Sequence, residues 1–249
     1  MNARVTRGFA KKYGQVFLCN RDIALFEASL LGNKHSSVLE IGSGEGFLTE
    51  VLLDRGFTVE AVEPDHVLAD VLRKKFASQI EAGKLSIIQE SILDMQFRSC
   101  DSIIGNIPYM ITAAIIFKIF DFNFKEAILM VQREFAAKAC AKPGSREAAR
   151  ITYSLQIRAY VEYMRTVPKV FFDPVPAVDS AIIRIIPRKL ENGINLQKAD
   201  ELLRLIFSAR RKKLGTILKG IQPEYSTLRA EDLSMEMFLD ICRSYSKNE

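Results

Sequence analysis

Four consecutive residues, Asn106, Ile107, Pro108 and Tyr109, have the side chains best suited to chemistry in this sequence. They follow the apolar run Ser102–Gly105, which predicts a buried strand. The Asn106 side-chain oxygen and the Ile107 carbonyl could accept both N–H groups of an exocyclic amine and draw its lone pair towards an electrophile. Pro108 would fix the acceptors in place, and Tyr109 could stack on a flat base. An ordinary turn uses the same residue types, so the rest of the chain must show whether residues 106–109 are a binding site or only a turn.

A glycine-rich turn lies upstream, in the segment VLEIGSGEGFLTE. Gly42, Gly44 and Gly46 would let the backbone approach a ligand closely between a strand and a helix. Phe47 stands where a nicotinamide-binding fingerprint has its third glycine, which disfavours a dehydrogenase. Glu63 ends the next predicted strand, where a carboxylate can accept both hydroxyls of a ribose or can simply face water. The turn and the acid together suit a nucleoside cofactor.

The 106–109 turn favours S-adenosylmethionine over a nicotinamide as that cofactor. At the carboxyl end of its strand the turn would hold a nucleophilic nitrogen in line with the sulfonium methyl group. The amine becomes a strong acid once it is methylated and can release its proton to water. A general base is therefore not required, and the scarcity of histidine, two residues in the chain, is no objection.

Short apolar runs alternate with segments of helical periodicity over most of the chain. The predicted strands are Ser37–Ile41, Phe57–Glu63, Leu85–Gln89, Ser102–Gly105, Ala127–Val131, Val161–Val167 and Ala181–Ile186. This alternation predicts an α/β fold with a doubly wound, mainly parallel, Rossmann-like sheet. Together with the features that favour S-adenosylmethionine, it predicts a sheet of the class I methyltransferase kind. The last two strands could form a hairpin across the proline-containing, exposed loop VFFDPVPAVDS.

The character of the sequence changes after Pro187. The segment RKLENGIN predicts a linker, and the apolar residues from Leu202 to Leu218 follow one face of a single helix that ends near Gly220. We therefore predict a methyltransferase domain over residues 1–187, with a basic N-terminal segment, and a small helical domain over 188–249.

Composition excludes several classes of protein. The chain has 249 residues, of which 48% are hydrophobic and 26% charged. No apolar run approaches the roughly 20 residues of a membrane span, and the N-terminus lacks the apolar stretch of a signal peptide, so we expect a cytoplasmic protein with no membrane partner. Four widely separated cysteines and two histidines predict reduced, buried thiols and no metal site.

The net charge is +5, a modest excess whose placement along the chain matters more than its size. The basic residues concerned are Lys11 and Lys12 near the N-terminus and Arg210, Arg211, Lys212 and Lys213 near the C-terminus. Either cluster could be a solvated face. Two clusters that flank an α/β core fit contact with a phosphate backbone better.

Seven segments, in order, resemble one known family over nearly the whole chain. They are KKYGQVFL, VLEIGSGEGFLT, VEPD, GNIPYMIT, VQREFAAKACAKPGS, FFDPVPAVDSAIIRI and FSARRKKLGTIL. The family is that of the ribosomal RNA adenine N6,N6-dimethyltransferases, which also contains the macrolide-resistance methylases of 23S RNA. The VDS segment and the basic helix favour the branch that acts on the small subunit.

The resemblance implies a set of site residues. Those implied for S-adenosylmethionine are Gln15, Val16, Leu18, Gly42, Gly44, Glu63, Glu90, Ser91, Ile92 and Asn106, and those for RNA are Phe172 and the two basic clusters. Val16 stands where the family usually has Asn or His, and Ser91 where it usually has Asp. A neutral hydroxyl binds an adenine amine less strongly than a carboxylate does, so we expect looser cofactor binding unless Glu90 substitutes.

The implied activity is methyl transfer from S-adenosylmethionine to the N6 amine of adenines in small-subunit ribosomal RNA, with a role in ribosome biogenesis. The implied partner is this RNA within the small subunit or its precursor, and we expect a monomer. We expect two methyl groups per adenine because Gly105, Thr112 and Ala113 are small and would leave space beside the target. The alternatives are an assembly factor with weak turnover, a 23S RNA methylase and a DNA adenine methylase.

Overall fold

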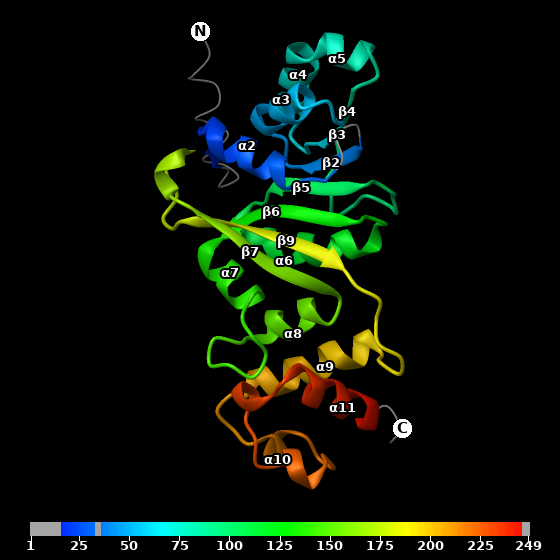
Figure 1. Cartoon of the computed structure of the whole chain (residues 1–249), viewed down its shortest axis with the longest axis vertical. Helices are drawn as coiled ribbons and strands as arrows, with labels where there is room; N and C mark the ends of the chain where they lie inside the picture. Colours follow the sequence, from blue (N-terminus) through cyan, green and yellow to red (C-terminus); the bar gives the residue numbers. More distant parts are fainter. Residues whose placement is uncertain (1–15, 33–35, 246–249) are drawn as a thin grey trace. The chain divides into compact units, whose positions relative to one another are not determined.

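The computed structural model describes residues 16–32 and 36–245, which form two compact units (Figure 1). One unit contains the described residues up to Arg133 together with Glu162–Pro187. The other contains Glu134–Val161 and the described residues from Arg188 onwards. The division after Pro187 coincides with the predicted boundary, but the sequence pattern does not indicate that residues 134–161 pack with the C-terminal helices. Lys11, Lys12 and Gln15 lie outside the described residues.

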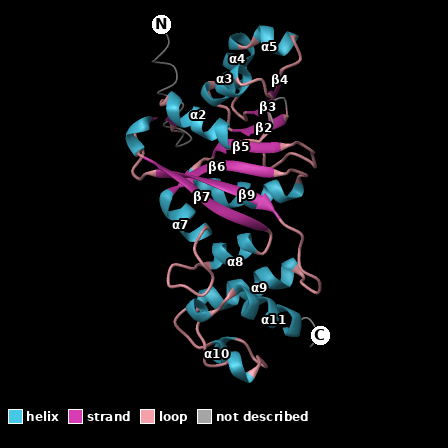
Figure 2. Cartoon of the chain, in the orientation of Figure 1, coloured by secondary structure: helices cyan, strands magenta, loops and turns pink. Residues whose placement is uncertain are grey.

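A seven-stranded sheet forms the centre of the first unit (Figure 2). Its strands are β2 (Ser37–Ile41), β3 (Thr58–Val62), β4 (Leu85–Ile88), β5 (Ser102–Asn106), β6 (Glu126–Gln132), β7 (Ala159–Val167) and β9 (Ser180–Pro187). The spatial order is β4-β3-β2-β5-β6-β9-β7. Strands β2 to β6 run parallel, and β9 runs antiparallel to β6. The predicted α/β fold with a mainly parallel sheet is confirmed.

The helices of the first unit are α2 (Arg21–Leu30), α3 (Phe47–Asp54), α4 (His66–Lys75), α5 (Ala77–Glu81) and α6 (Thr112–Lys118), with the short 3-10 turns η1 (Tyr109–Ile111), η2 (Ile119–Asp121) and η3 (Lys169–Phe171). Helices α2, α3, α4 and α6 each bury apolar side chains, whereas the short helix α5 buries none. Ile23 of α2 and Leu52 of α3 are buried in one core with Ile104 of β5. The Asn20 side chain accepts the Ile23 N–H at 3.1 Å and so caps α2, while Asp65 caps α4.

A second, two-stranded sheet pairs β1 (Phe17–Leu18) with β8 (Phe172–Asp173) in antiparallel fashion. Leu18 lies opposite Phe172, and both are buried. Strands as short as these carry no periodicity that could predict them. Their pairing fixes the segment before α2 beside the β7–β9 connection, whose residues 173–178 are mostly exposed, as predicted.

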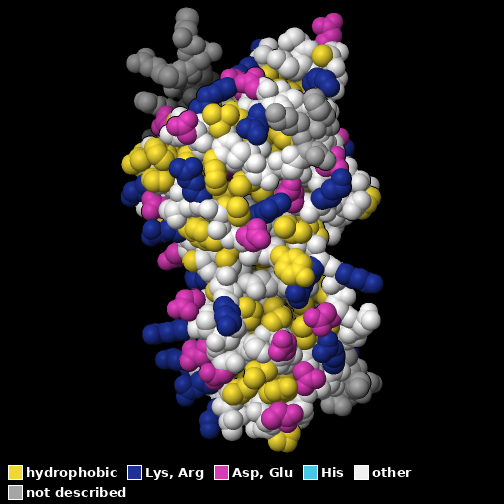
Figure 3. Space-filling view, viewed as in Figure 1, with side chains coloured by type: hydrophobic (Ala, Val, Ile, Leu, Met, Phe, Trp, Pro, Cys, Tyr) yellow, Lys and Arg dark blue, Asp and Glu magenta, His cyan; other side chains and the backbone are white. Residues whose placement is uncertain are grey.

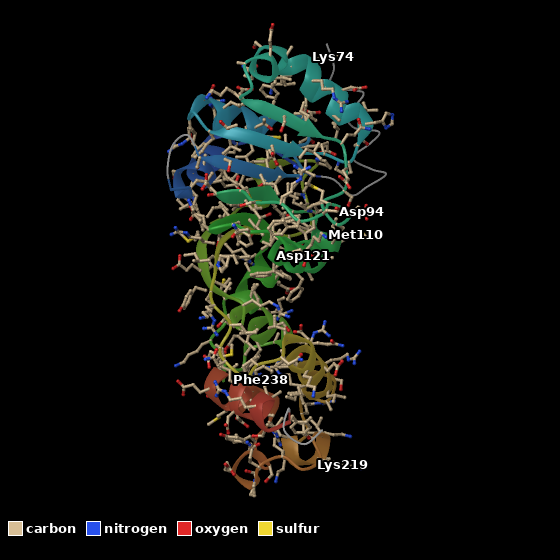
Figure 4. All side chains as sticks on the ribbon, turned by 90° about the vertical axis from the view of Figure 1, so that its right-hand side faces the viewer. Lys74, Asp94, Met110, Asp121, Lys219 and Phe238 are labelled. Carbon is tan, nitrogen blue, oxygen red and sulfur yellow. The ribbon has the colours of Figure 1, made fainter. Side chains whose placement is uncertain are left out.

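The second unit is helical. It contains α8 (Arg150–Gln156), α9 (Leu196–Ser208), α10 (Leu214–Ile217), α11 (Met235–Tyr245) and most of α7 (Arg133–Ala139), with the 3-10 turns η4 (Pro223–Tyr225) and η5 (Ala230–Asp232). Tyr153, Leu203 and Phe238, the last labelled in Figure 4, are fully buried in its core.

The predicted single helix up to Gly220 is wrong. Helix α9 ends at Ser208, and the chain turns before α10 begins at Leu214. Leu214 is nevertheless fully buried, and its N–H donates to the Leu228 carbonyl at 2.7 Å. Apolar side chains are buried on both sides of the turn. Their spacing in the sequence is therefore the same as that expected for one continuous helix. The basic cluster Arg210–Lys213 lies in this turn and not on a helix.

Candidate active site

A cavity of about 320 Å³ lies at the carboxyl ends of β2, β3 and β5. Ten residues predicted for cofactor, catalysis or RNA line it, namely Val16, Leu18, Gly42, Gly44, Glu63, Asn106, Ile107, Pro108, Tyr109 and Phe172. The structure thus brings together residues that are far apart in the sequence. Sequence reasoning missed other lining residues, among them Phe17, Cys19, Glu40, Phe47, Met130 and Ser180. Of these, Phe17, Glu40, Phe47 and Ser180 lie within segments that the motifs had already marked.

The glycine-rich turn forms one wall of the cavity. Gly42 has φ 73° and Gly44 has φ 55°, values that side-chain-bearing residues rarely adopt. A Cβ atom on Gly44 would lie 3.1 Å from the Phe17 ring, and one on Gly42 would lie 3.7 Å from the main-chain oxygen of Asn106. The two glycines therefore keep the space between β1, the turn and β5 open.

Glu63 is held rigidly at the end of β3. One carboxylate oxygen accepts the Gly44 N–H at 2.8 Å, and the other accepts the Asp65 N–H at 3.0 Å. The residue is only 2% exposed, and this burial raises the pKa of its carboxyl group. Glu63 is therefore not a solvated strand-end acid. Each oxygen keeps a lone pair that could accept a ligand hydroxyl.

A second carboxyl group, that of Glu40 in β2, also lines the cavity. It is 1% exposed and accepts a hydrogen bond from the Thr49 hydroxyl at 2.6 Å. Burial raises its pKa to about 7, against the lowering effect of that bond. Glu27 of α2 is fully buried as well, and burial raises its pKa well above the usual range, with a smaller contribution from the charge of Glu40. The sequence analysis assigned a role to neither group, although Glu40 lies within the glycine-rich segment VLEIGSGEGFLTE.

The turn after β5 has a fixed backbone. The Ile107 N–H donates to the Met130 carbonyl at 2.9 Å, and Pro108 adopts φ −57° and ψ 130°. The Pro108 carbonyl accepts bonds from the Ile111 N–H at 3.2 Å and from the Thr112 hydroxyl at 3.1 Å. The acceptors of the turn are therefore set in position before any ligand arrives.

The Asn106 side-chain oxygen is buried and has no hydrogen-bond partner among the described residues. A buried acceptor without a partner costs roughly 1–3 kcal/mol. Such an atom in the wall of a cavity is suited to a donor that a ligand brings.

Tyr109 ties the turn to β9. Its hydroxyl lies 2.7 Å from that of Ser180, which is fully buried. Burial raises the pKa of Tyr109, so the phenol stays neutral at physiological pH. This bond connects the VDS segment to the NIPY turn.

The three residues Glu90, Ser91 and Ile92 do not line the cavity within the described part of the chain. They follow β4, whose last residue, Ile88, accepts the Glu63 N–H at 3.0 Å. The Ser91 hydroxyl oxygen accepts the Leu93 N–H at 3.2 Å, Glu90 is exposed, and Ile92 is buried. The segment lies at the same edge of the sheet as Glu63.

The expectation that Gly105 leaves space beside the target is wrong. A Cβ atom on Gly105 would lie 2.4 Å from the Ile41 carbonyl oxygen, so this glycine lets β5 approach β2. Neither Thr112 nor Ala113 is among the residues that line the cavity in the described ranges.

Within the described residues, no group of three or more His, Cys, Asp or Glu side chains could hold a metal ion. None of the helices in this part of the chain is long and apolar enough to span a membrane. None of the four cysteines, all of them in the described ranges, forms a disulfide bond. Cys242 is buried, but Cys19 is exposed, contrary to the expectation of buried thiols.

The basic cluster lies in the second unit. Arg211, Lys212 and Lys213 are exposed, whereas the Arg210 guanidinium donates to the Arg146 carbonyl and lies 3.9 Å from a Glu231 carboxylate oxygen. Further Lys and Arg side chains are visible on this unit in Figure 3. Three side chains of the cluster are thus available to an anionic partner.

Comparison with known proteins gives a consistent result. The sequence model of the family described as Ribosomal RNA adenine dimethylase matches residues 7–245. A probable ribosomal RNA small subunit methyltransferase A from Methanospirillum hungatei is 34% identical over 93% of this chain and 97% of that protein. A dimethyladenosine transferase from Plasmodium falciparum is similar in structure, with a TM-score of 0.79, 26% identity and coverage of 93% and 98% of the two chains. The 23S rRNA methyltransferase ErmE gives a TM-score of 0.74, 26% identity and coverage of 90% and 97%.

Proposed function

We propose a function from one premise: the chain belongs to the ribosomal RNA adenine dimethylase family of S-adenosylmethionine-dependent methyltransferases. The proposed function is methylation of N6 of adenines in small-subunit ribosomal RNA. One observation carries the proposal. The Asn106 side-chain oxygen is buried without a partner among the described residues, in the wall of a cavity that also holds the glycine-rich turn and Glu63.

The cavity fits S-adenosylmethionine by the chemistry of its donors and acceptors. Glu63 would accept the ribose hydroxyls, and Gly42 and Gly44 would let the backbone lie against the ligand. Val16 and Leu18 would contribute apolar surface from the segment that β1 fixes beside the cavity. A volume of about 320 Å³ is in the range of small-molecule sites.

The residues of the turn would position the adenine amine. S-adenosylmethionine, when bound, supplies an electrophilic methyl group on a positively charged sulfur. The Asn106 side-chain oxygen and the Ile107 carbonyl accept the two N–H groups, so the nitrogen lone pair is directed away from the ring. Tyr109 and Phe172 offer aromatic faces to the base, which must leave its stack to enter the cavity. The amine loses its proton to water after transfer, so no side chain in the cavity has to act as a base.

The small-subunit target rests on likeness of sequence. Two relatives named for the small subunit are 34% and 33% identical to this chain over most of its length. The two solved structures do not discriminate between the targets, because the dimethyladenosine transferase and the 23S rRNA methyltransferase are both 26% identical. The exposed cations Arg211, Lys212 and Lys213 would bind the phosphate backbone of folded RNA. Ser91 in place of the family's usual Asp supports a second candidate, an assembly factor on the same fold with weak turnover.

The test is incubation of the full chain with labelled S-adenosylmethionine and one of three acceptors: immature small ribosomal subunits, naked 23S RNA or duplex DNA. Mass spectrometry of the nucleosides would identify the product. Dimethyladenosine from the small subunits alone is the expected result. Label only in 23S RNA or DNA would refute the target. Binding to small subunits without label would favour the assembly factor, and monomethyladenosine alone would refute dimethylation.

A further inference from the structure

Met110, labelled in Figure 4, is the most exposed large apolar side chain of the described residues, at 92% exposure. It follows Tyr109, which lines the cavity, within the 3-10 turn η1. Single exposed apolar residues are common on proteins and need no explanation by themselves. Three further observations distinguish this one.

The backbone that carries Met110 is rigid. The Pro108 carbonyl accepts bonds from Ile111 and Thr112 on the far side of Met110, and the Tyr109 hydroxyl is bonded to that of Ser180. A side chain that extends from a fixed turn into solvent can enter a partner without rearrangement of its own backbone.

The second loop beside the cavity is apolar as well. Val175 and Val178 are 60% and 42% exposed and lie just before Ser180, the partner of Tyr109. Figure 3 shows apolar side chains gathered over the connection between β7 and β9, at the left-hand edge of the view. The Tyr109–Ser180 bond therefore joins two loops that both expose apolar side chains.

The two segments that expose these side chains contain no charged residue. The chain has none between Asp101 and Lys118, and none between Asp173 and Asp179. Lys169, earlier in the β7–β9 connection, reaches the second segment, where its ammonium group donates to the Ala177 carbonyl at 3.4 Å. Phosphate groups are held mainly by Lys and Arg, so the segment that carries Met110 is poorly suited to the sugar–phosphate backbone. The apolar faces of nucleobases are the part of an RNA that these side chains fit.

We propose that Met110 inserts between nucleobases next to the target adenine and takes its place in the stack when that adenine enters the cavity. Apolar side chains, including Met, act as wedges between base steps in other nucleic-acid complexes, and a thioether packs well on aromatic faces. This inference rests on the proposed function. It makes Met110 a positioning residue that favours the extruded state of the substrate and takes no part in the transfer.

Substitutions of Met110 that change its size or its polarity test the proposal, with the methylation rate as the measurement. Burial of a Met side chain contributes about 1.5–3 kcal/mol, so Met110→Ala should lower kcat about tenfold or more on immature small subunits. Met110→Leu keeps the apolar volume and should restore most of the rate. Met110→Gln has similar length but is polar and should behave like Met110→Ala. Val71→Ala, an exposed apolar truncation on α4, is the matched control and should leave the rate unchanged.

Base unstacking provides a direct readout. A hairpin RNA with 2-aminopurine beside an unpaired adenine should gain fluorescence with the wild type and with Met110→Leu, but not with Met110→Ala or Met110→Gln. Equal kcat and equal fluorescence for wild type and Met110→Ala would overturn the inference. A melting temperature several degrees lower in Met110→Ala would also overturn it, because it would show that Met110 packs within the protein. A wild type that methylates no RNA adenine would instead overturn the proposed function.

Discussion

Asn106→Ala should separate activity from stability. The substitution removes a buried side-chain oxygen that has no partner among the described residues, so the folded protein loses no hydrogen bond to that oxygen. Because an unpaired buried acceptor costs roughly 1–3 kcal/mol, the free energy of unfolding should stay unchanged or rise by up to about 1 kcal/mol. Loss of one preorganised polar group that acts in the transition state typically costs about 3–4 kcal/mol, so kcat should fall about 100- to 1000-fold.

The assay combines single-turnover methylation, cofactor binding by calorimetry and thermal unfolding. The affinity for S-adenosylmethionine should change by less than about threefold, since the loss is confined to the transition state. Asn123→Ala is a suitable control because Asn123 lies outside the cavity and its amide donates to the Ser99 hydroxyl at 3.1 Å. That variant should lose a little stability and no activity. Equal losses of cofactor affinity and rate in Asn106→Ala, or a clear drop in its melting temperature, would refute the assigned role.

Three further outcomes are expected. Ser91→Asp should bind S-adenosylmethionine about tenfold more tightly in calorimetry, because a hydrogen bond to a charged group contributes about 1.5–3 kcal/mol against about 1 for a neutral one; no gain would contradict the inferred contact. Arg211→Ala should weaken RNA binding and reduce the slope of log K against log salt by about one, as measured by filter binding from 50 to 200 mM salt; an unchanged slope would show that this side chain touches no phosphate. Glu40→Gln should reduce the dependence of stability on pH. The pKa of Glu40 rises from its ordinary value of 4.5 to about 7 on folding. Between pH 4.5 and pH 7 the folded state therefore binds more protons than the unfolded state. The free energy of unfolding should fall by about 3 kcal/mol as the pH rises through this range. Melting curves at pH 5 and pH 8 should therefore differ less for Glu40→Gln than for the wild type, and an equal difference would refute the assignment.

The cavity-lining turns were predictable from sequence because each is local. Gly42 and Gly44 lie two residues apart in one strand-to-helix turn, and residues 106–109 begin at the last residue of β5. Parallel strands bring their carboxyl ends to the same edge of a sheet, so the strand pattern alone places both turns and Glu63 together. The resemblance to the adenine dimethyltransferases is confirmed by the family match over residues 7–245.

Features that depend on segments far apart in the chain were not predictable. Pairing of Leu18 with Phe172 builds a wall of the cavity from strands too short to show a period. The break after Ser208 is hidden because buried leucines continue the helical spacing on both sides of it.

The sequence by itself determined the fold class and the family, and it drew attention to the turn that we propose holds an adenine amine, because these depend on periodicity and on residues close together in the chain. Only the tertiary structure decided which groups line the cavity, what their pKa values are and which of them have hydrogen-bond partners. It buries Glu40, which raises the pKa of its carboxyl group to about 7. It also leaves the Asn106 side-chain oxygen without a hydrogen-bond partner among the described residues. The physical reason is that burial and hydrogen bonding depend on every segment packed around a group, and most of those segments are distant in sequence.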